Sequence, residues 1–189
     1  GNTFDGNTFA NNFKQGLSIT TDNNIVTNNT ITANSLTFSL GAGLSFFTWE
    51  SNTASGNTVN FNTITGNGGL GGIGSTSLGQ NDISKNWWGS ATGPTLTSNP
   101  GGSGDKLWTN RDISLLSYSP WLGKAPGSTP MEWYLNTTGT ILDGIDAPAN
   151  GETSHVLAGT YVEDVRVTNK FFNLIGEVDG TGAPVSIVQ

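Results

Sequence analysis

The chain has 189 residues, a net charge of −7 and no cysteine. Its seven Lys and Arg residues are too few and too scattered to form the basic patch that nucleic-acid binding needs, and the absence of cysteine excludes disulfides and cysteine-based metal sites. No apolar run approaches the roughly 18 residues of a membrane span. The chain opens with Gly1 and carries no signal segment, so we expect a mature product or a piece of a longer protein.

Residues 1–89 repeat a short frame in which a β-branched or apolar residue lies between two asparagines. The frames are NTFDGN (2–7), NTFANN (7–12), NIVTNN (24–29), NTITAN (29–34), NTVNFN (57–62), NTITGN (62–67) and NDISKN (81–86). Between them, residues 16–20, 35–39, 43–47 and 69–74 are predicted as short strands, because apolar and polar residues alternate there with the period of a strand.

The spacing of the apolar residues predicts the architecture. Phe9 precedes Ile31 by 22 residues, while the steps from Leu17 to Leu36 and from Ile64 to Ile83 are both 19 residues. A period near 20 is too short for a propeller blade or a helical repeat pair. It suits one turn of a parallel β-solenoid, with two or three short strands per turn and turns about 4.8 Å apart.

In such a solenoid, each framed apolar residue points inward and stacks on its equivalent in the next turn. The flanking asparagines are expected at the bends, because Asn tolerates the left-handed backbone conformation that tight bends need. Their amides can also bond from turn to turn and so form ladders. The residues predicted to form these ladders are Asn7, Asn29, Asn34, Asn62, Asn67, Asn81 and Asn86.

These repeats resemble the right-handed parallel β-helix of the pectate-lyase-like superfamily, over residues 1–89. The segments NWWGSATGPTLTSNPGGSGDKL (86–107) and ISLLSYSPWLG (113–123) resemble the part that closes such helices in bacterial and archaeal extracellular proteins. The resemblance implies that Trp87, Trp88 and Trp121 cap the last turn and hide its open strand edge. Stacking on a sugar is the alternative role for these tryptophans.

The segment 139–189 resembles the beginning of a β-helix, because GTYVEDVRV (159–167) and NLIG (173–176) match the opening strands of the family. Pro148 is expected to shorten the opening helix to about two turns within residues 139–147. The predicted organisation is therefore β-helix turns in 1–89, a terminator in 90–123, a connector in 124–138 and a start segment in 139–189. Placing Gly1 of one copy after Gln189 of another would give one whole β-helix.

The sequence therefore predicts an all-β protein: a right-handed parallel β-helix, or β-solenoid, with a Trp-rich cap and a second start segment. We expect an extracellular or cell-surface location and a structural role in a filament or stalk. The expected partners are other copies of the chain, stacked head to tail either as separate subunits or as blocks of one polypeptide. An arbitrary fragment boundary is the plain alternative to such an assembly.

Two other function classes stay open. The first is a polysaccharide-binding surface module that uses Phe47 and Trp49, and the second is a polysaccharide lyase. The acids of the repetitive half are Asp5, Asp22, Glu50 and Asp82, none of which pair on one strand face, so no catalytic residue, metal or cofactor is predicted. Among the glycosylation patterns, the one at Asn136 is the better candidate.

Overall fold

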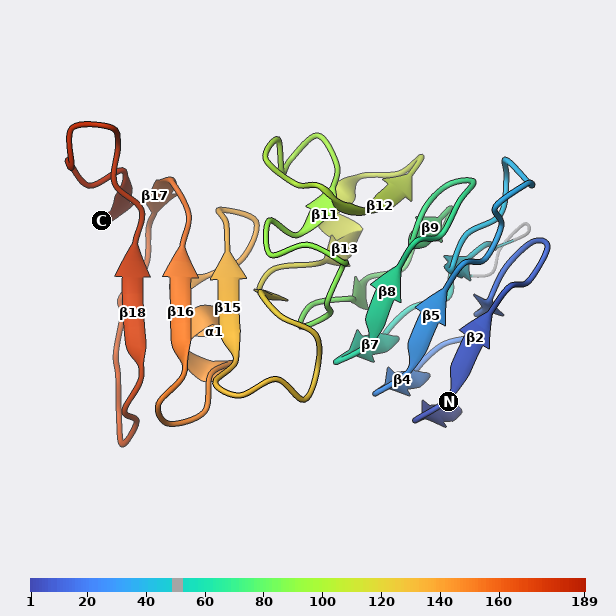
Figure 1. Ribbon diagram of the computed structural model, residues 1–189, viewed down its shortest axis with the longest axis horizontal. Helices are drawn as coiled ribbons and strands as arrows, with labels where there is room; N and C mark the ends of the chain where they lie inside the picture. Colours follow the sequence, from blue (N-terminus) through green and yellow to red (C-terminus); the bar gives the residue numbers. More distant parts are fainter. Residues whose placement is uncertain (49–52) are drawn as a thin grey trace.

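The structure, a computed structural model, describes residues 1–48 and 53–189. It is elongated and mainly β, and its short strands follow one another along the long axis (Figure 1). Residues 1–48 and 53–118 wind as a parallel solenoid, in which we call each full turn a coil. Residues 121–189 add a second set of strands at the far end of the same axis (Figure 1).

Three parallel sheets form the faces of the solenoid. Sheet A holds β1 (Thr3–Asp5), β4 (Ile25–Thr27), β7 (Thr58–Asn60), β10 (Asn81–Asp82) and β13 (Leu116–Ser117). Sheet B holds β2 (Thr8–Ala10), β5 (Thr30–Thr32) and β8 (Thr63–Thr65). Sheet C holds β3 (Leu17–Ser18), β6 (Leu44–Phe46), β9 (Ile73–Ser75), β12 (Gly104–Thr109) and β11 (Pro94–Thr95). The first three coils each pass through the three sheets in the same order.

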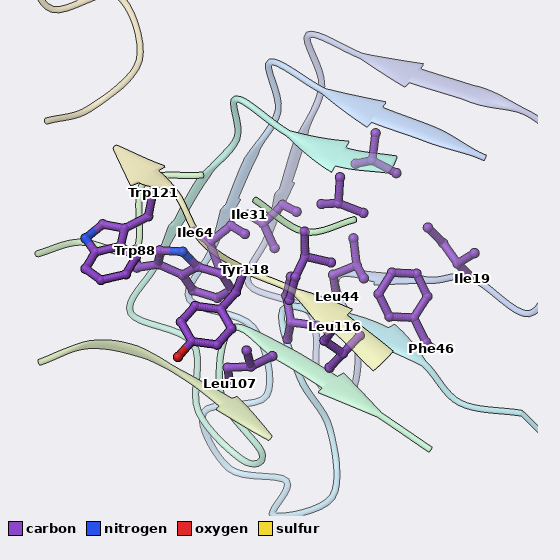
Figure 2. Packing of buried hydrophobic residues seen from close by; sticks show 14 of the residues in the cluster. Ile19, Ile31, Leu44, Phe46, Ile64, Trp88, Leu107, Leu116, Tyr118 and Trp121 are labelled. Carbon is purple, nitrogen blue, oxygen red and sulfur yellow. The ribbon is translucent and has the colours of Figure 1, made fainter. Parts of the chain in front are cut away.

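Apolar residues stack inside the solenoid because equivalent strand positions lie directly above one another. In sheet B, Phe9 pairs with Ile31 and Ile31 with Ile64. In sheet C, Leu44 pairs with Ile73, and both are fully buried. Figure 2 shows Ile31, Ile64 and Leu44 among the side chains that converge on one interior. Each fully buried side chain of this size contributes about 1.5–3 kcal/mol, so every added coil adds apolar burial along with backbone hydrogen bonds.

The coils differ in length, which corrects part of the predicted spacing. Paired ladder asparagines are 22, 33 and 24 residues apart. Leu17 pairs with Leu44, not with Leu36, and Leu36 is 64% exposed in a loop. The predicted strand at 35–39 is therefore wrong: Ser35 adopts a φ of 56° and turns the chain away from a strand path.

The last frame also falls elsewhere than predicted. Asn81 and Asn86 lie over Asn57 and Asn62, so the frame NDISKN stacks on NTVNFN instead of on NTITGN. The strand predicted at 69–74 is shorter than expected, since it begins only at Ile73. Gly71 has a φ of 112°, and a Cβ there would lie 2.4 Å from the Lys106 carbonyl oxygen, so a glycine before this strand permits a close backbone approach between coils.

The second set of strands starts where the solenoid chain reverses. One sheet holds β14 (Trp121–Leu122), β15 (Glu132–Leu135), β16 (Thr153–Val156) and β18 (Asn173–Gly176), and β17 (Gly159–Tyr161) pairs with β19 (Ser186–Val188). Only β14 and β15 run antiparallel among these pairs. The segment 124–138, predicted as a connector, thus contains a strand. A short 3-10 helix (Ile113–Leu115) precedes β13.

The α-helix α1 (Ile141–Asp146) opens the segment predicted as a β-helix start. Thr140 and Asp143 form a reciprocal capping box at its first turn. Ile141 and Ile145 are buried in a small core with Leu135, Val156 and Tyr161. The helix therefore covers the interior of the second set of strands at the end where that set begins.

Backbone hydrogen bonds join the two sets of strands. The Lys85 N–H donates to the Pro120 carbonyl at 2.6 Å, and the Leu122 N–H donates to the Asn86 carbonyl at 3.1 Å. Residue 87 forms a parallel bridge to Thr63 of β8. The row of strands that begins with sheet B thus continues through β14 to β15, β16 and β18 without a break in backbone pairing.

Candidate functional site

Three asparagine ladders run along the bends of the solenoid. In each step, the backbone N–H and the side-chain Nδ2 of one Asn both donate to the Oδ1 of the Asn in the next coil, as from Asn29 to Asn62 at 2.9 and 3.0 Å. The first ladder holds Asn2, Asn24, Asn57 and Asn81, the second holds Asn7, Asn29, Asn62 and Asn86, and the third holds Asn12, Asn34, Asn67 and Asp105.

All seven predicted ladder residues lie in these ladders: Asn81 in the first, Asn7, Asn29, Asn62 and Asn86 in the second, and Asn34 and Asn67 in the third. Sequence reasoning missed Asn2, Asn12, Asn24, Asn57 and Asp105. A five-residue spacing within each coil, as in 24, 29 and 34, could have identified the asparagines. No such signal marks Asp105, which comes from a position 38 residues after its partner Asn67.

The left-handed residue at each bend precedes the ladder Asn, which corrects the predicted role of the asparagines. Nine such residues have φ between 52° and 68°: Gly6, Asn11, Asn23, Asn28, Ala33, Gly56, Phe61, Gly66 and Lys85. The bend turns the following amide inward, where Asn29, Asn34 and Asn62 are at most 1% exposed. Buried amides need partners, and the ladder supplies them.

Asp105 ends the third ladder with a carboxylate. Its Oδ2 accepts the N–H and Nδ2 of Asn67 at 3.0 and 2.7 Å, and its Oδ1 accepts the Gly66 N–H at 2.8 Å. Burial raises the pKa of Asp105, and the three hydrogen bonds oppose that shift without cancelling it. A carboxylate has no N–H, so the side chain at this rung cannot donate to a further coil, and the backbone N–H of Asp105 donates to the Trp88 carbonyl.

The predicted cap tryptophans lie where the two sets of strands meet. Trp88 and Trp121 are fully buried in the solenoid core, and Trp87 packs in a smaller cluster with Leu122 and Trp133. Trp121 donates its Nε1–H to the Ala91 carbonyl at 2.9 Å, whereas the buried Nε1 of Trp88 has no partner among the described residues. All three thus contact the junction, and β15 covers the edge of β14.

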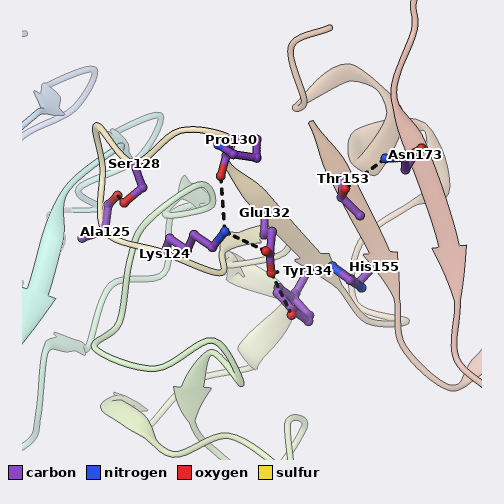
Figure 3. A network of polar contacts seen from close by, with 9 residues as sticks. All are labelled: Lys124, Ala125, Ser128, Pro130, Glu132, Tyr134, Thr153, His155 and Asn173. Atoms are coloured by element: carbon purple, nitrogen blue, oxygen red, sulfur yellow. Dashed lines mark hydrogen bonds and ion pairs between the residues drawn. The ribbon is translucent and has the colours of Figure 1, made fainter. Parts of the chain in front are cut away.

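Aromatic rings stack across this junction. Trp121 lies between Tyr118 and Tyr134, with ring centroids 6.3 and 6.4 Å apart, and Tyr134 stacks on His155 at 4.4 Å. Figure 3 shows the polar contacts beside this stack. Lys124 forms an ion pair with Glu132 at 2.7 Å, which lowers the pKa of Glu132. Burial and then the nearby Glu132 charge raise the pKa of Tyr134.

The two ends of the molecule present different chemistry. At the first coil, the Oδ1 atoms of Asn2, Asn7 and Asn12 receive no hydrogen bond from any described residue, although every later ladder Asn receives two. At the other end, nine large apolar side chains are 37–81% exposed: Val162, Val165, Val167, Phe171, Leu174, Ile175, Val178, Ile187 and Val188. The first end offers acceptors, and the second offers apolar surface.

The predicted sugar-binding pair is only partly described. Phe47 is half-buried and lines a surface groove of about 470 Å³ together with Phe38, Leu40, Leu70 and Trp108. Lys14 borders this groove and lies 5.3 Å from the centroid of the Phe38 ring. Trp49 lies outside the described residues. Sequence reasoning missed Phe38 and Trp108, because Phe38 lies in a loop and Trp108 lies in β12, and neither is placed by the spacing of the repeats.

The predicted glycosylation residue is unsuitable in the folded state. Asn136 is 7% exposed, and its Nδ2 donates to the Tyr118 hydroxyl at 3.0 Å and to the Ser98 carbonyl at 3.3 Å. A glycan on this nitrogen would displace both bonds, so the burial of Asn136 disfavours its modification in the folded protein, and glycosylation there stays a prediction.

The described part of the chain has neither a group of metal-ligating side chains nor a long apolar helix. In residues 1–48 and 53–189, no group of three or more His, Cys, Asp or Glu side chains is arranged to hold a metal ion. Within that same part of the chain, no helix combines the length and apolar character needed to cross a membrane. The single His155 lies in the aromatic stack described above.

Comparison with known families identifies the solenoid. Residues 1–88 match the family model described as the right handed beta helix region. Comparisons with curated proteins and with solved structures found no match. Residues 1–88 are thus a right-handed β-helix region, and their parallel sheets stack as in a β-helix.

Proposed function

We propose that this protein is a structural module of an extracellular filament or cell-surface stalk, whose blocks stack head to tail through the ends of their β-helices. The observation that carries the proposal is the pair of complementary open ends. Exposed apolar side chains such as Phe171 (81%) and Ile187 (45%) lie at one end, and unpartnered ladder acceptors lie at the other. A contact of this head-to-tail type that does not close into a ring produces a filament.

The β-helix architecture supports a mechanical, structural role. Each coil contributes a buried stack and three ladder rungs, so the stability of the rod is a sum over neighbouring coils and needs no metal or disulfide. Open strand edges and bare apolar ends are liabilities in water. Within one block, Trp87, Trp88 and Trp121 serve as an internal cap that seals the solenoid core against the second set of strands.

Negative-stain imaging and light scattering over a range of concentrations test the proposal. We expect rods that lengthen with concentration, with a width set by one β-helix. The variant Val188→Lys places a charge on an apolar side chain, 51% exposed, whose register position is that of the buried Tyr161, and it should reduce the length of the rods. Its matched control is Leu78→Lys, which changes another exposed apolar residue, 58% exposed and away from both ends. Single particles at every concentration, or equal loss in both variants, would refute end-to-end stacking.

A second candidate function is polysaccharide binding in the groove beside Phe47. The observation that favours it is the convergence of Phe38, Phe47 and Trp108 on one open groove, because exposed aromatic faces stack on the apolar faces of sugars. Binding to a glycan array that disappears in Trp108→Ala would support this function. Binding that persists in that variant would place the sugar elsewhere.

A further inference from the structure

We infer that the end formed by β18 and β19 accepts the first coil of a second copy in one defined register, in which Leu174 lies over Phe9 and Ser186 lies over Leu17. This inference rests on the proposed head-to-tail function and adds the chemistry of the joint. It names the partner as the coil of residues 1–23, and it fixes which residues meet.

The direction in which each backbone N–H donates, toward the preceding or the following coil, sets the register. We first compare sheet B with the strands β15, β16 and β18. In sheet B, the first residue of each strand donates backward to the ladder Asn of the preceding coil: Thr30 to Asn7 and Thr63 to Asn29, both at 2.9 Å. In the second set of strands, Asn173 donates backward to the Glu152 carbonyl, also at 2.9 Å. Asn173 therefore donates in the same direction as Thr30, the first residue of β5, and the two residues hold equivalent positions in their strands.

The same direction of donation predicts the next layer of this row. Backbone pairing continues from sheet B through β14, β15 and β16 to β18, with one antiparallel step between β14 and β15. A second copy placed with its β2 parallel to β18 continues this row. Asn173 then faces Thr8, Leu174 faces Phe9 and Ile175 faces Ala10. Leu174 shares its register position with the buried Ser154, so it meets Phe9 on the interior side.

The strands β17 and β19, compared with sheet C, independently predict a register for the same joint. In sheet C, the first strand residue donates forward: Leu17 to the Gly43 carbonyl at 3.0 Å and Leu44 to the Gly72 carbonyl at 2.8 Å. In the second set of strands, Gly159 donates forward to the Val185 carbonyl at 2.9 Å. The strands β17 and β19 thus donate in the same direction as the strands of sheet C, and a following β3 would place Leu17 over Ser186.

This register supplies one missing donor at the ladder position. Phe172 precedes Asn173 and therefore occupies the place that a ladder Asn has in sheet B. Its backbone N–H has no partner among the described residues, and the Oδ1 of Asn7 receives no donor from them either. In the predicted joint, the Phe172 N–H donates to Asn7 Oδ1, just as the Asn7 N–H donates to Asn29 Oδ1 at 2.8 Å.

The apolar surfaces also match. Leu174 is 41% exposed and Val188 is 51% exposed in the isolated chain. Phe9 and Leu17 are half-buried and already pack against the solenoid core from its open end. Docking in this register removes these side chains from water, and it extends the interior stack across the joint.

Engineered disulfides test the register, since the chain has no cysteine of its own. The pair Ala10→Cys with Ile175→Cys lies in register, with Cα atoms about 4.8 Å apart across neighbouring strands, within the range that a disulfide bridges. The control pair Ala10→Cys with Asn173→Cys lies on the same face but two residues out of register, with Cα atoms roughly 8 Å apart, beyond that range. Both pairs are oxidised in the 189-residue protein and separated on a non-reducing gel.

The expected result is a series of covalent oligomers from the in-register pair and only monomers from the control pair, with circular dichroism confirming that both fold. If rods form by imaging but the in-register pair fails to cross-link, or the control pair cross-links equally, the register is wrong while head-to-tail stacking survives. If no rods form and neither pair cross-links, the register and the proposed function fail together. Cysteine-free protein and each single-cysteine variant serve as controls for non-specific oxidation.

Discussion

The ladder makes a quantitative prediction at Asn62, a fully buried residue in the middle of the second ladder. Its Nδ2 donates to the carbonyls of Val26 and Asn60, both at 2.9 Å, and to Asn86 Oδ1 at 3.0 Å. Its Oδ1 accepts the backbone N–H and the Nδ2 of Asn29. The substitution Asn62→Ala removes all of these bonds at once.

Three of the partners become buried groups that lose a bond: the Asn29 N–H and the carbonyls of Val26 and Asn60, from residues that are at most 9% exposed. A buried group that loses its partner costs about 1–3 kcal/mol. We therefore expect Asn62→Ala to lower the free energy of unfolding by about 3 kcal/mol or more, a large part of the roughly 5–15 kcal/mol that stabilises a typical domain.

The matched control is Asn7→Ala, at the exposed end of the same ladder. Asn7 keeps its backbone bond to Asn29 Oδ1 after the substitution, and water can replace the lost side-chain bonds because this residue is exposed. We expect it to cost only about 0.5–1.5 kcal/mol in the unassembled chain.

Urea unfolding, followed by the fluorescence of the six tryptophans, measures both variants. A solenoid can unfold in stages, so the midpoint and the slope are compared at two emission wavelengths and by circular dichroism. The reasoning is refuted if Asn62→Ala shifts the midpoint no further than Asn7→Ala does, because burial would then not decide the value of a rung.

Three other predictions concern the terminal rung and the junction. Burial raises the pKa of Asp105 in the folded state, so the ionised carboxylate lowers the stability of the fold. As the pH falls through the folded pKa toward the ordinary value, the wild type should therefore gain stability relative to Asp105→Asn. A difference in melting temperature between the two proteins that stays constant with pH would contradict this. Trp88→Phe removes a buried N–H that lacks a partner among the described residues, whereas Trp121→Phe breaks the hydrogen bond to the Ala91 carbonyl. We therefore expect Trp88→Phe to lose much less stability than Trp121→Phe. Equal losses measured by calorimetry would show that only the ring volume matters. Gly93 has a φ of 76°, and a Cβ there would lie 2.5 Å from the Trp121 ring. Gly93→Ala should therefore lower the free energy of unfolding by about 1 kcal/mol or more. An unchanged melting temperature would exclude this close approach.

The sequence by itself determined the repeating unit of this protein. Each coil repeats the same local structure, a tight bend followed by a short strand, and similar residues form that structure each time. Frames such as NTITAN and NTITGN therefore identify the solenoid, its parallel stacking and its inward apolar positions, as in Ile31 and Ile64. The tryptophans of the segment 86–123 were also identifiable as a special group.

Only the tertiary structure decided the contacts between unlike segments. The loops that lengthen one coil to 33 residues hid the pairing of Leu17 with Leu44, because loop length does not alter the strand register that follows. The rung at Asp105 and the antiparallel turn from β14 to β15 depend on where the chain returns after long loops. The burial of Asn136 likewise follows from the packing of the second set of strands against residues 98–118. Such contacts join residues that share no repeat, so periodicity cannot predict them.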